Sequence, residues 1–210
     1  MTETGSNEMA SKLVVGTFVS LDGVMQSPGG PGEDDSNGFR QGGWLPPHVD
    51  EGFNRIMGPL FDRADGLLLG RRSYDILASH WPDVPDEEGG AKINSMPKYV
   101  TTRTPMAAKW RNTQVLVGDA AQTVADLKRD TDGVLLVQGS SDLIGTLQRA
   151  ELVDEYHLLV FPVVLGEGKR LFAEGTVPAG LKLTGSSATD AGVAYLTYEW
   201  TGKPSYNTLV

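Results

Sequence analysis

Residues 66–80, GLLLGRRSYDILASH, place a short apolar strand directly before a helical pattern. A glycine ends the strand, and two arginines and a serine open the helix. Residues 133–149, GVLLVQGSSDLIGTLQR, repeat this arrangement, with Gly139 at the end of the apolar run. Short buried strands that alternate with helices are typical of a mostly parallel sheet with helices on both faces. The sequence therefore predicts an α/β fold.

The same alternation continues on either side of these two junctions. We expect further strands over residues 12–20, 98–102, 113–117 and 155–165, and further helices over residues 49–64 and 119–129. Gly58-Pro59 is expected to kink or interrupt the first of those helices. Two alternating runs, 181–189 and 193–201, flank Asp190-Ala-Gly192 and predict a closing antiparallel hairpin.

No change of composition divides the chain, so we expect one domain over residues 12–201. Residues 1–11 are small and polar and predict a disordered lead-in, and residues 202–210 predict a loose tail. A long Gly- and Pro-rich segment from Gln26 to Pro47 is expected to form a functional lid or to be partly disordered.

Charge and composition narrow the classes of function. The 210 residues hold 18 Lys and Arg against 27 Asp and Glu, a net charge of −9, which argues against a nucleic-acid partner. The absence of cysteine excludes disulfides and Cys-ligated zinc and suits a cytoplasmic location. We expect no membrane partner, because the longest apolar run, residues 158–165, is far shorter than a membrane span, and no secretory leader is expected. Three scattered histidines indicate no metal site.

The first candidate site is the strand-to-helix junction Gly70-Arg71-Arg72-Ser73. In an open α/β sheet, ligands bind beyond the carboxyl ends of the strands. The free N–H groups of a helix start favour an anion, and arginine adds forked donors that match phosphate oxygens. Beside a dinucleotide, such an arginine would select the 2′-phosphate of NADP. The alternative is a surface helix with solvated arginines.

Two further strand ends carry polar side chains. At Gly139-Ser140-Ser141 the glycine permits close approach of a ligand, and the helix start offers N–H groups to a pyrophosphate; the alternative is an ordinary N-cap. At Thr101-Thr102-Arg103 hydroxyls and a cation follow a strand; the alternative is a polar strand exit before a proline. No GxGxxG fingerprint is present, and Gly166–Arg170 is interpreted as a turn.

Taken in chain order, these motifs resemble those of the dihydrofolate reductase-like superfamily. The chain is most similar to the branch that includes the C-terminal reductase domain of the riboflavin-biosynthesis deaminase–reductase. The resemblance covers roughly residues 12–201 and rests on the motifs Ser20–Gly23, Gly42–Trp44, Leu69–Tyr74, Tyr99–Thr102, Gln138–Ser141 and Leu158–Phe172.

The resemblance implies an NADPH-dependent reductase that acts on a small-molecule substrate, and a homodimer. It assigns Gly70 to Ser73 to the cofactor phosphates, and Thr101, Thr102 and Arg103 to the adenosine 2′-phosphate. It assigns Gly139, Ser140, Ser141 and Leu143 to the pyrophosphate turn. Ser20 to Gly23 would lie over the nicotinamide and Trp44 near the substrate, so Ser20, Gly23 and Trp44 are the expected substrate-binding residues.

The sequence also departs from the family. Two glycines, often joined by a cis peptide, usually form the pyrophosphate turn, whereas Gly139 is followed here by Ser140. We expect no deaminase domain beside the reductase domain. Residues 28–43 form an acidic, Gly-rich insertion where a substrate would be sensed. Dihydrofolate reductases place an acidic residue on the helix that follows the tryptophan-bearing loop. The nearest candidates in this sequence are Asp50 and Glu51, with His48 beside them.

The leading functional hypothesis is hydride transfer from NADPH to a small heterocycle or to a carbonyl or imine, with a 5-amino-6-(5-phosphoribosylamino)uracil reductase-like activity as one candidate. The expected proton donor is Asp50, or water ordered by Asp22 or Asp50. One rival is a catalytically silent nucleotide-binding sensor on the same fold, and another is an interaction protein without a nucleotide site.

Overall fold

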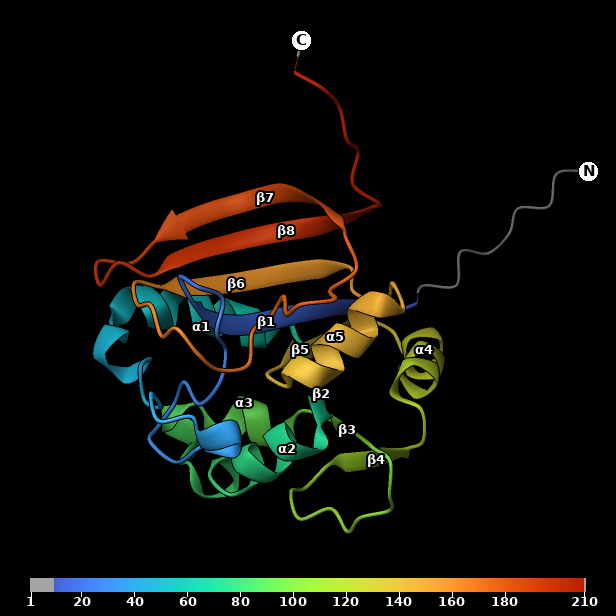
Figure 1. Cartoon of the computed structure of the whole chain (residues 1–210). Helices are drawn as coiled ribbons and strands as arrows, with labels where there is room; N and C mark the ends of the chain where they lie inside the picture. Colours follow the sequence, from blue (N-terminus) through green and yellow to red (C-terminus); the bar gives the residue numbers. More distant parts are fainter. Residues whose placement is uncertain (1–9, 210) are drawn as a thin grey trace, which may run out of the picture.

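The computed structural model describes residues 10–209, which form one eight-stranded sheet in the order β4-β3-β2-β5-β1-β6-β8-β7 (Figure 1). Strands β1 to β6 are mutually parallel, and β8 runs antiparallel to β6 and β7. The predicted mostly parallel mixed sheet with a closing antiparallel hairpin is confirmed. The strands are β1 (Lys12–Ser20), β2 (Gly66–Gly70), β3 (Lys98–Thr102), β4 (Thr113–Val117), β5 (Val134–Gln138), β6 (Glu155–Phe161), β7 (Gly180–Ala188) and β8 (Ala194–Gly202).

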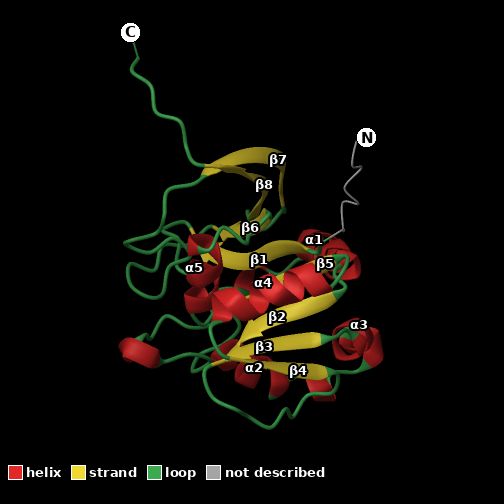
Figure 2. Cartoon of the chain, turned by 90° about the vertical axis from the view of Figure 1, so that its right-hand side faces the viewer, coloured by secondary structure: helices red, strands yellow, loops and turns green. Residues whose placement is uncertain are grey.

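Helices cover both faces of the sheet. Helices α4 and α5 pack on one face through Val124, Leu127 and Ile144, and α4 lies on the near side in Figure 2. On the other face, Leu60, Tyr74 and Ile93 bring α1, α2 and α3 onto the sheet. The α-helices within residues 10–209 are α1 (Glu51–Arg63), α2 (Arg71–Ala78), α3 (Gly90–Ser95), α4 (Ala120–Asp130) and α5 (Ser141–Arg149). None of them is both long and apolar enough to cross a membrane.

The placement of β5 decides where a ligand can bind. Although β5 comes late in the chain, it lies between β1 and β2, with Val137 paired to both Val15 and Leu68. The carboxyl end of β5 therefore lies beside the carboxyl end of β2. The two glycine-ended junctions of the sequence meet at this edge of the sheet.

Two expectations were wrong near prolines: an interruption of the first helix at Gly58-Pro59, and a strand that runs on to residue 165. Helix α1 continues through Gly58 and Pro59, because both residues lie on its exposed side while Phe53 and Leu60 bury the opposite side. On that side, water can satisfy the carbonyl that Pro59 leaves without a donor. Strand β6 ends at Phe161 and does not extend to residue 165, because Pro162 has no N–H to continue the ladder.

The ends of the chain differ slightly from expectation. Ser11 is buried, and its backbone N–H donates to the carbonyls of Lys128 and Thr131, so the fold begins one residue before β1. The rest of the predicted lead-in lies, except for residue 10, outside the described residues. Residues 203–209 follow β8 without helix or strand.

Candidate functional site

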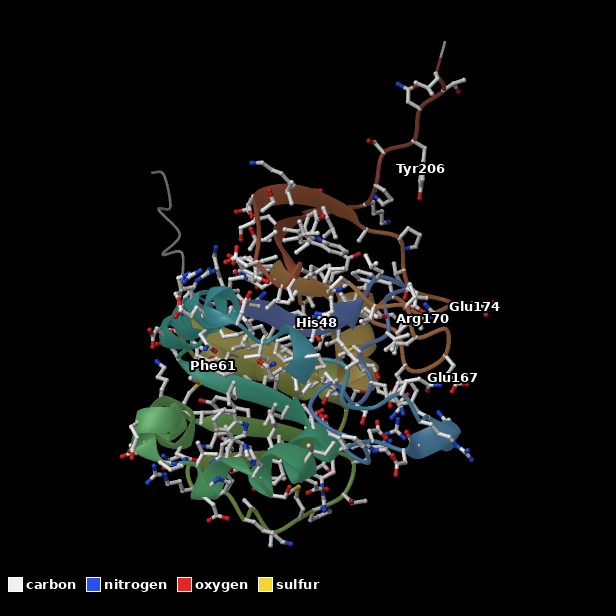
Figure 3. All side chains as sticks on the ribbon, turned by 90° about the vertical axis from the view of Figure 1, so that its left-hand side faces the viewer. His48, Phe61, Glu167, Arg170, Glu174 and Tyr206 are labelled. Carbon is white, nitrogen blue, oxygen red and sulfur yellow. The ribbon has the colours of Figure 1, made fainter. Side chains whose placement is uncertain are left out.

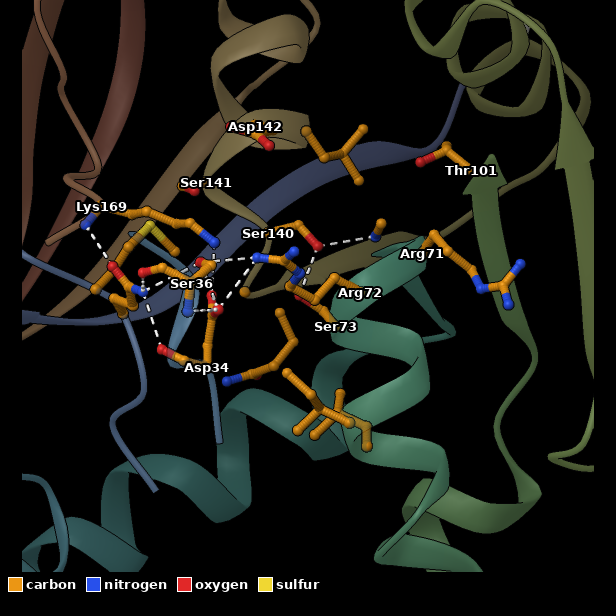
Figure 4. Close-up of a pocket in the computed structure, with 18 of the residues that line it drawn as sticks. Asp34, Ser36, Arg71, Arg72, Ser73, Thr101, Ser140, Ser141, Asp142 and Lys169 are labelled. Atoms are coloured by element: carbon orange, nitrogen blue, oxygen red, sulfur yellow. Dashed lines mark hydrogen bonds and ion pairs between the residues drawn. The ribbon is translucent and has the colours of Figure 1, made fainter. Parts of the chain in front are cut away.

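A cleft of about 910 Å³ opens at the carboxyl edge of the parallel strands (Figure 4). All of the residues that the resemblance assigned to the coenzyme line it, and they come from the ends of β2, β3 and β5 and the helices that follow. These residues are Gly70, Arg71, Arg72, Ser73, Thr101, Thr102, Arg103, Gly139, Ser140, Ser141 and Leu143. The structure thus brings together motifs that lie 70 residues apart in the chain.

Ser140 joins the two central junctions. Its Oγ accepts a hydrogen bond from the backbone N–H of Gly70 at 2.9 Å and donates to Ser73 Oγ at 2.6 Å. A Cβ atom on Gly70 would lie 2.6 Å from Ser140 Oγ. The absence of a side chain at position 70 is therefore a requirement of this close approach.

The backbone of the Gly139-Ser140 turn is left-handed at both residues. Gly139 has φ of 70° and Ser140 has φ of 69°, a region that favours glycine and costs a serine conformational energy. No cis peptide bond occurs within residues 10–209, so the Gly139–Ser140 bond is trans. Ser140 stands where the family usually has a second glycine. Its hydroxyl forms hydrogen bonds to Gly70 and Ser73 of the other junction.

The helices that begin at the cleft offer free N–H groups. Helix α2 starts after Gly70 and α5 after Ser140, and neither has a side-chain cap. By contrast, Asp50 caps α1 and Asp119 caps α4 through hydrogen bonds from backbone N–H groups. The first N–H groups of α2 and α5 remain available to an anion between them.

An ion-pair cluster of Asp34, Ser36, Arg72 and Lys169, the Asp34 clasp, crosses one end of the cleft (Figure 4). The Asp34 carboxylate accepts from Lys169 Nζ at 2.6 Å and from Arg72 Nη1 at 3.1 Å. Arg72 also donates to Ser36 Oγ at 2.9 Å. Burial opposes ionisation of Asp34, but the hydrogen bonds from Lys169 and Ser36 outweigh it and lower its pKa to about 2. The clasp ties the segment 26–43 to the start of α2.

The other polar groups of the predicted coenzyme site line the opposite part of the cleft. Arg71 pairs with Asp75 at 2.7 Å, with about half of its side chain exposed. Thr101 and Thr102 are buried, and Arg103 beside them is exposed. An exposed guanidinium beside buried hydroxyls suits a phosphate.

Three residues expected near the substrate support a loop and do not themselves line the cleft. Ser20 Oγ accepts from the N–H of Val24 and donates to Asp22, and Gly23 takes the turn with φ of 81°. Trp44 is buried and donates its Nε1 to the carbonyl of Gln26 at 2.9 Å. The segment that they hold, from Met25 to Pro28, does line the cleft.

Asp22 and Asp50, the candidate proton donors, also lie outside the lining. Asp22 accepts from the backbone N–H groups of Leu165 and Gly166 and pairs with Arg170, which Figure 3 shows on the segment after β6. A hydrogen bond from Ser20, with those from this turn, lowers the pKa of Asp22. Asp50 accepts from Phe53 N and Ala191 N, which lowers its pKa. Their catalytic role stays a prediction.

The neighbours of Asp50, Glu51 and His48, are also not among the residues that line the cleft. Glu51 is exposed on the first turn of α1, where it pairs with Arg55. The ring of His48 packs edge-on against Phe161 at 5.9 Å. Within residues 10–209, no group of three His, Cys, Asp or Glu side chains is placed to hold a metal.

Sequence reasoning missed several lining residues. Asp34 and Lys169 come from loops, and Thr17, Phe18 and Gln138 come from the ends of the two central strands β1 and β5. Gly166–Arg170 is a loop, as expected, but Lys169 reaches the cleft from it. The strand-end residues could have been found, because β1 and β5 were both predicted and both end at the same edge.

Comparison with known proteins agrees with this architecture. The RibD C-terminal domain profile matches residues 11–195. The chain belongs to this family. This chain is also similar to uncharacterized protein YyaP of Bacillus subtilis (strain 168), with 29% identity over 202 residues, covering 94% of this chain and 99% of YyaP.

Solved structures share the fold. A putative riboflavin biosynthesis protein from Shewanella sp. PV-4 has a TM-score of 0.67 at 24% identity, covering 92% of this chain and 99% of that one. A dihydrofolate reductase from Enterococcus faecalis, complexed with NADP(H), has a TM-score of 0.59 at 16% identity, covering 92% and 98%. At these identities the likeness concerns the fold.

Proposed function

We propose that this member of the RibD C-terminal domain family is an NADPH-dependent reductase. It would reduce a small heterocycle, carbonyl or imine, and a 5-amino-6-(5-phosphoribosylamino)uracil reductase-like reaction is one candidate. The observation that carries the proposal is the pair of uncapped helix starts, α2 and α5, joined through Ser140 in one cleft. The matching Enterococcus structure is complexed with NADP(H), which supports the choice of coenzyme.

The residues present fit a dinucleotide. The first N–H groups of α2 and α5 would hold the pyrophosphate, and the bare Cα of Gly70 leaves room for Ser140 between them. Arg103 and Arg71 would meet the 2′-phosphate, with Thr101 and Thr102 beside the ribose. The cleft volume of about 910 Å³ lies within the usual range for cofactor sites.

When bound, NADPH supplies a hydride to the acceptor, and a proton from water completes the two-electron reduction. The chain would position the acceptor beside the coenzyme and keep bulk water away from both. Phe18, Met25 and Ile76 add apolar surface to the lining of the cleft, on which a flat acceptor would pack. The Asp34 clasp holds the segment 26–43 across the cleft and so limits access of bulk water.

Titration of the purified protein with NADPH and NADH tests the proposal. We expect tighter binding of NADPH, and a loss of roughly tenfold in NADPH affinity in Arg71→Ala and Arg103→Ala with little change for NADH. Arg55→Ala is the matched control, because Arg55 is an exposed arginine on α1 away from the cleft. Equal affinity of the parent for both coenzymes would contradict the phosphate assignment.

A second candidate is nucleotide binding without turnover. It is favoured by the positions of Asp22 and Asp50, whose carboxylates are engaged by loop and helix N–H groups outside the cleft. NADPH oxidation measured over a panel of pterins, aminopyrimidines and quinones separates the two. Oxidation with any one acceptor excludes the silent form.

The homodimer implied by the resemblance and the cytoplasmic location favoured by the absence of cysteine stay proposals. Light scattering of the purified chain over a range of concentrations tests the first. A mass of twice 22.5 kDa is expected for the dimer.

A further inference from the structure

Asp34 places a negative charge in a cleft that is proposed to bind the phosphates of a dinucleotide. Its carboxylate is largely buried, with 13% of the side chain exposed. Both oxygens are engaged: Oδ2 accepts from Lys169 Nζ at 2.6 Å, and Oδ1 accepts from Ser36 Oγ at 2.6 Å and from Arg72 Nη1 at 3.1 Å. An unpaired carboxylate would repel a phosphate, so the effect of Asp34 on a ligand depends on the donors that its partners keep free.

Arg72 connects Asp34 to the candidate phosphate site. It lies in the first turn of α2 and lines the cleft. Both of its hydrogen bonds in the clasp come from one nitrogen, Nη1, which donates to Asp34 and to Ser36. In the view of Figure 4, the guanidinium lies between these acceptors and the hydroxyl of Ser140.

The other edge of the Arg72 guanidinium has no partner in the described part of the chain. Nε and Nη2 make no hydrogen bond within residues 10–209, whereas Nη1 makes two. A guanidinium binds a phosphate most strongly through two parallel N–H groups, and Nε with Nη2 is such a pair. The clasp therefore holds Arg72 by one end and leaves a complete phosphate-binding edge.

Asp34 is held firmly enough to serve as the base of this arrangement. Lys169, which binds it, donates its backbone N–H to Gln26 Oε1 at 3.0 Å and accepts from Met25 N at 2.8 Å. The carboxylate is thus tied to the segment that follows β1. Arg72, by contrast, has 60% of its side chain exposed, and a free arginine loses much rotamer freedom when it binds a ligand.

We propose that Asp34 is a positioning residue that holds Arg72 by Nη1, so that Nε and Nη2 stay ready to donate to a phosphate of the coenzyme. This inference rests on the proposed reductase function and gives the acidic insertion, residues 28–43, a part in coenzyme binding. The ligand completes a row of alternating charges: Lys169, Asp34, Arg72 and phosphate. Ordering Arg72 in advance lowers the entropic cost of binding, and by linkage the bound phosphate stabilises the clasp.

The sign of one substitution tests the proposal. Asp34→Asn removes a negative charge from the cleft, which on charge alone would tighten the binding of NADPH. If Asp34 positions Arg72, the substitution instead weakens NADPH binding, by about threefold to tenfold in a fluorescence titration of the purified protein. Asp35→Asn is the matched control, because it removes the same charge from the next, exposed side chain and should leave the affinity almost unchanged. Unchanged or tighter binding by Asp34→Asn would overturn the proposal.

A double-substitution cycle separates positioning from a general loosening of the loop. Arg72→Gln removes the group that Asp34 is proposed to hold, and Asp34→Asn should then cause no further loss of NADPH affinity. A loss that persists in the Arg72→Gln background would show that Asp34 acts through the fold of its own segment, contrary to the proposal.

Hydrogen exchange provides a readout other than affinity. Ser36 N donates to Asp34 Oδ1 at 3.2 Å, so the amides of residues 34–38 report on the clasp. Saturating NADPH should slow their exchange in the parent but not in Arg72→Gln; equal slowing in both would mean that the ligand covers the segment directly, and would refute the positioning role. A parent that binds no NADPH overturns the proposed function and this inference together. A parent that binds NADPH no more tightly than Asp34→Asn overturns this inference alone.

Discussion

The hydroxyl of Ser140 lies between the N–H of Gly70, at 2.9 Å, and the hydroxyl of Ser73, at 2.6 Å. This one side chain holds the first turn of α5 against the first turn of α2. Both helices lack a side-chain cap, so the same contact aligns two sets of free N–H groups. The geometry of the candidate anion site depends on how closely these helix starts approach.

Gly70→Ala tests that approach. The new Cβ would lie 2.6 Å from Ser140 Oγ and 3.0 Å from Ser140 Cβ, so either Ser140 rotates and loses its hydrogen bonds or the two junctions separate. We expect weaker NADPH binding and a loss of about 1–3 kcal/mol in the free energy of unfolding, typical of overpacking. Gly145→Ala in α5 is the matched control, because its Cβ would meet only Arg149 Nη1 at 3.6 Å. That variant should gain about 0.5–1 kcal/mol, and unchanged NADPH affinity in Gly70→Ala would refute the requirement for glycine.

Asp34→Asn tests the Asp34 clasp. The substitution removes the charge that Arg72 and Lys169 share, so the segment 26–43 should open more often. We expect faster amide hydrogen exchange in that segment and a loss of about 1–3 kcal/mol of overall stability, because Lys169, which is mostly buried, loses its charged partner. Asp35→Asn is the control, because Asp35 is next to Asp34 in the sequence and its side chain is exposed. Similar exchange in both variants would mean that the ion pairs do not hold the segment.

Lys98 gives a prediction about alkaline pH. This lysine is fully buried, donates to the carbonyls of Ile93 and Asn94, and lies 4.5 Å from the ring of Trp110. Burial, with a smaller contribution from the charge of Arg111, lowers its pKa from 10.5 to about 8. Between these values the unfolded chain binds more protons, so this lysine should make the fold more stable as pH rises from 8 to 10.5.

The measurement is urea unfolding at several values of pH in that window. The free energy of unfolding of the parent should rise relative to that of Lys98→Met as pH increases. Lys109→Met, at an exposed lysine, serves as the control and should keep the pH dependence of the parent. A constant difference between parent and Lys98→Met from pH 8 to 10.5 would contradict the lowered pKa.

Asp50→Ala separates a structural from a catalytic carboxylate. Asp50 accepts from Phe53 N at the start of α1 and from Ala191 N in the turn between β7 and β8. We expect a lower midpoint of thermal unfolding, because both N–H groups lose their acceptor. Glu51→Ala, next to it on the exposed surface, should have a smaller effect. Once an acceptor is known, a fall of 100-fold or more in kcat without loss of stability would instead identify Asp50 as a proton donor.

Much of this cleft could be predicted because strand ends obey a simple rule. The apolar runs before Gly70, Thr102 and Gly139 are buried parallel strands, and the carboxyl ends of such strands meet at one edge. The residues that follow them therefore share a site even without knowledge of the topology. The resemblance to a known family added the expectation that these strand ends bind NADPH.

Loop residues resisted prediction for a physical reason. The contribution of Asp34 depends on Lys169, which is 135 residues away, and no local pattern pairs them. Asp22 shows the same limit in a different way. Its place before a glycine indicates a turn, but no local pattern indicates that its carboxylate accepts hydrogen bonds from the N–H groups of residues 165 and 166. Pro59 was misjudged because its effect depends on which side of α1 faces water.

The position of β5 in the chain, after β4, has a consequence for folding during synthesis. A nascent chain that has emerged only as far as residue 130 already contains Gly70, Arg72 and Asp34, yet the strand that separates β1 from β2 has not been made. The ladder β2-β3-β4 then lacks its neighbour β5, strand β1 has neither of its neighbours, and the cleft has only one of its two helix starts. A ligand that bridges the starts of α2 and α5 could stabilise a newly made molecule only after residue 149 leaves the ribosome, when α5 can pack beside α2.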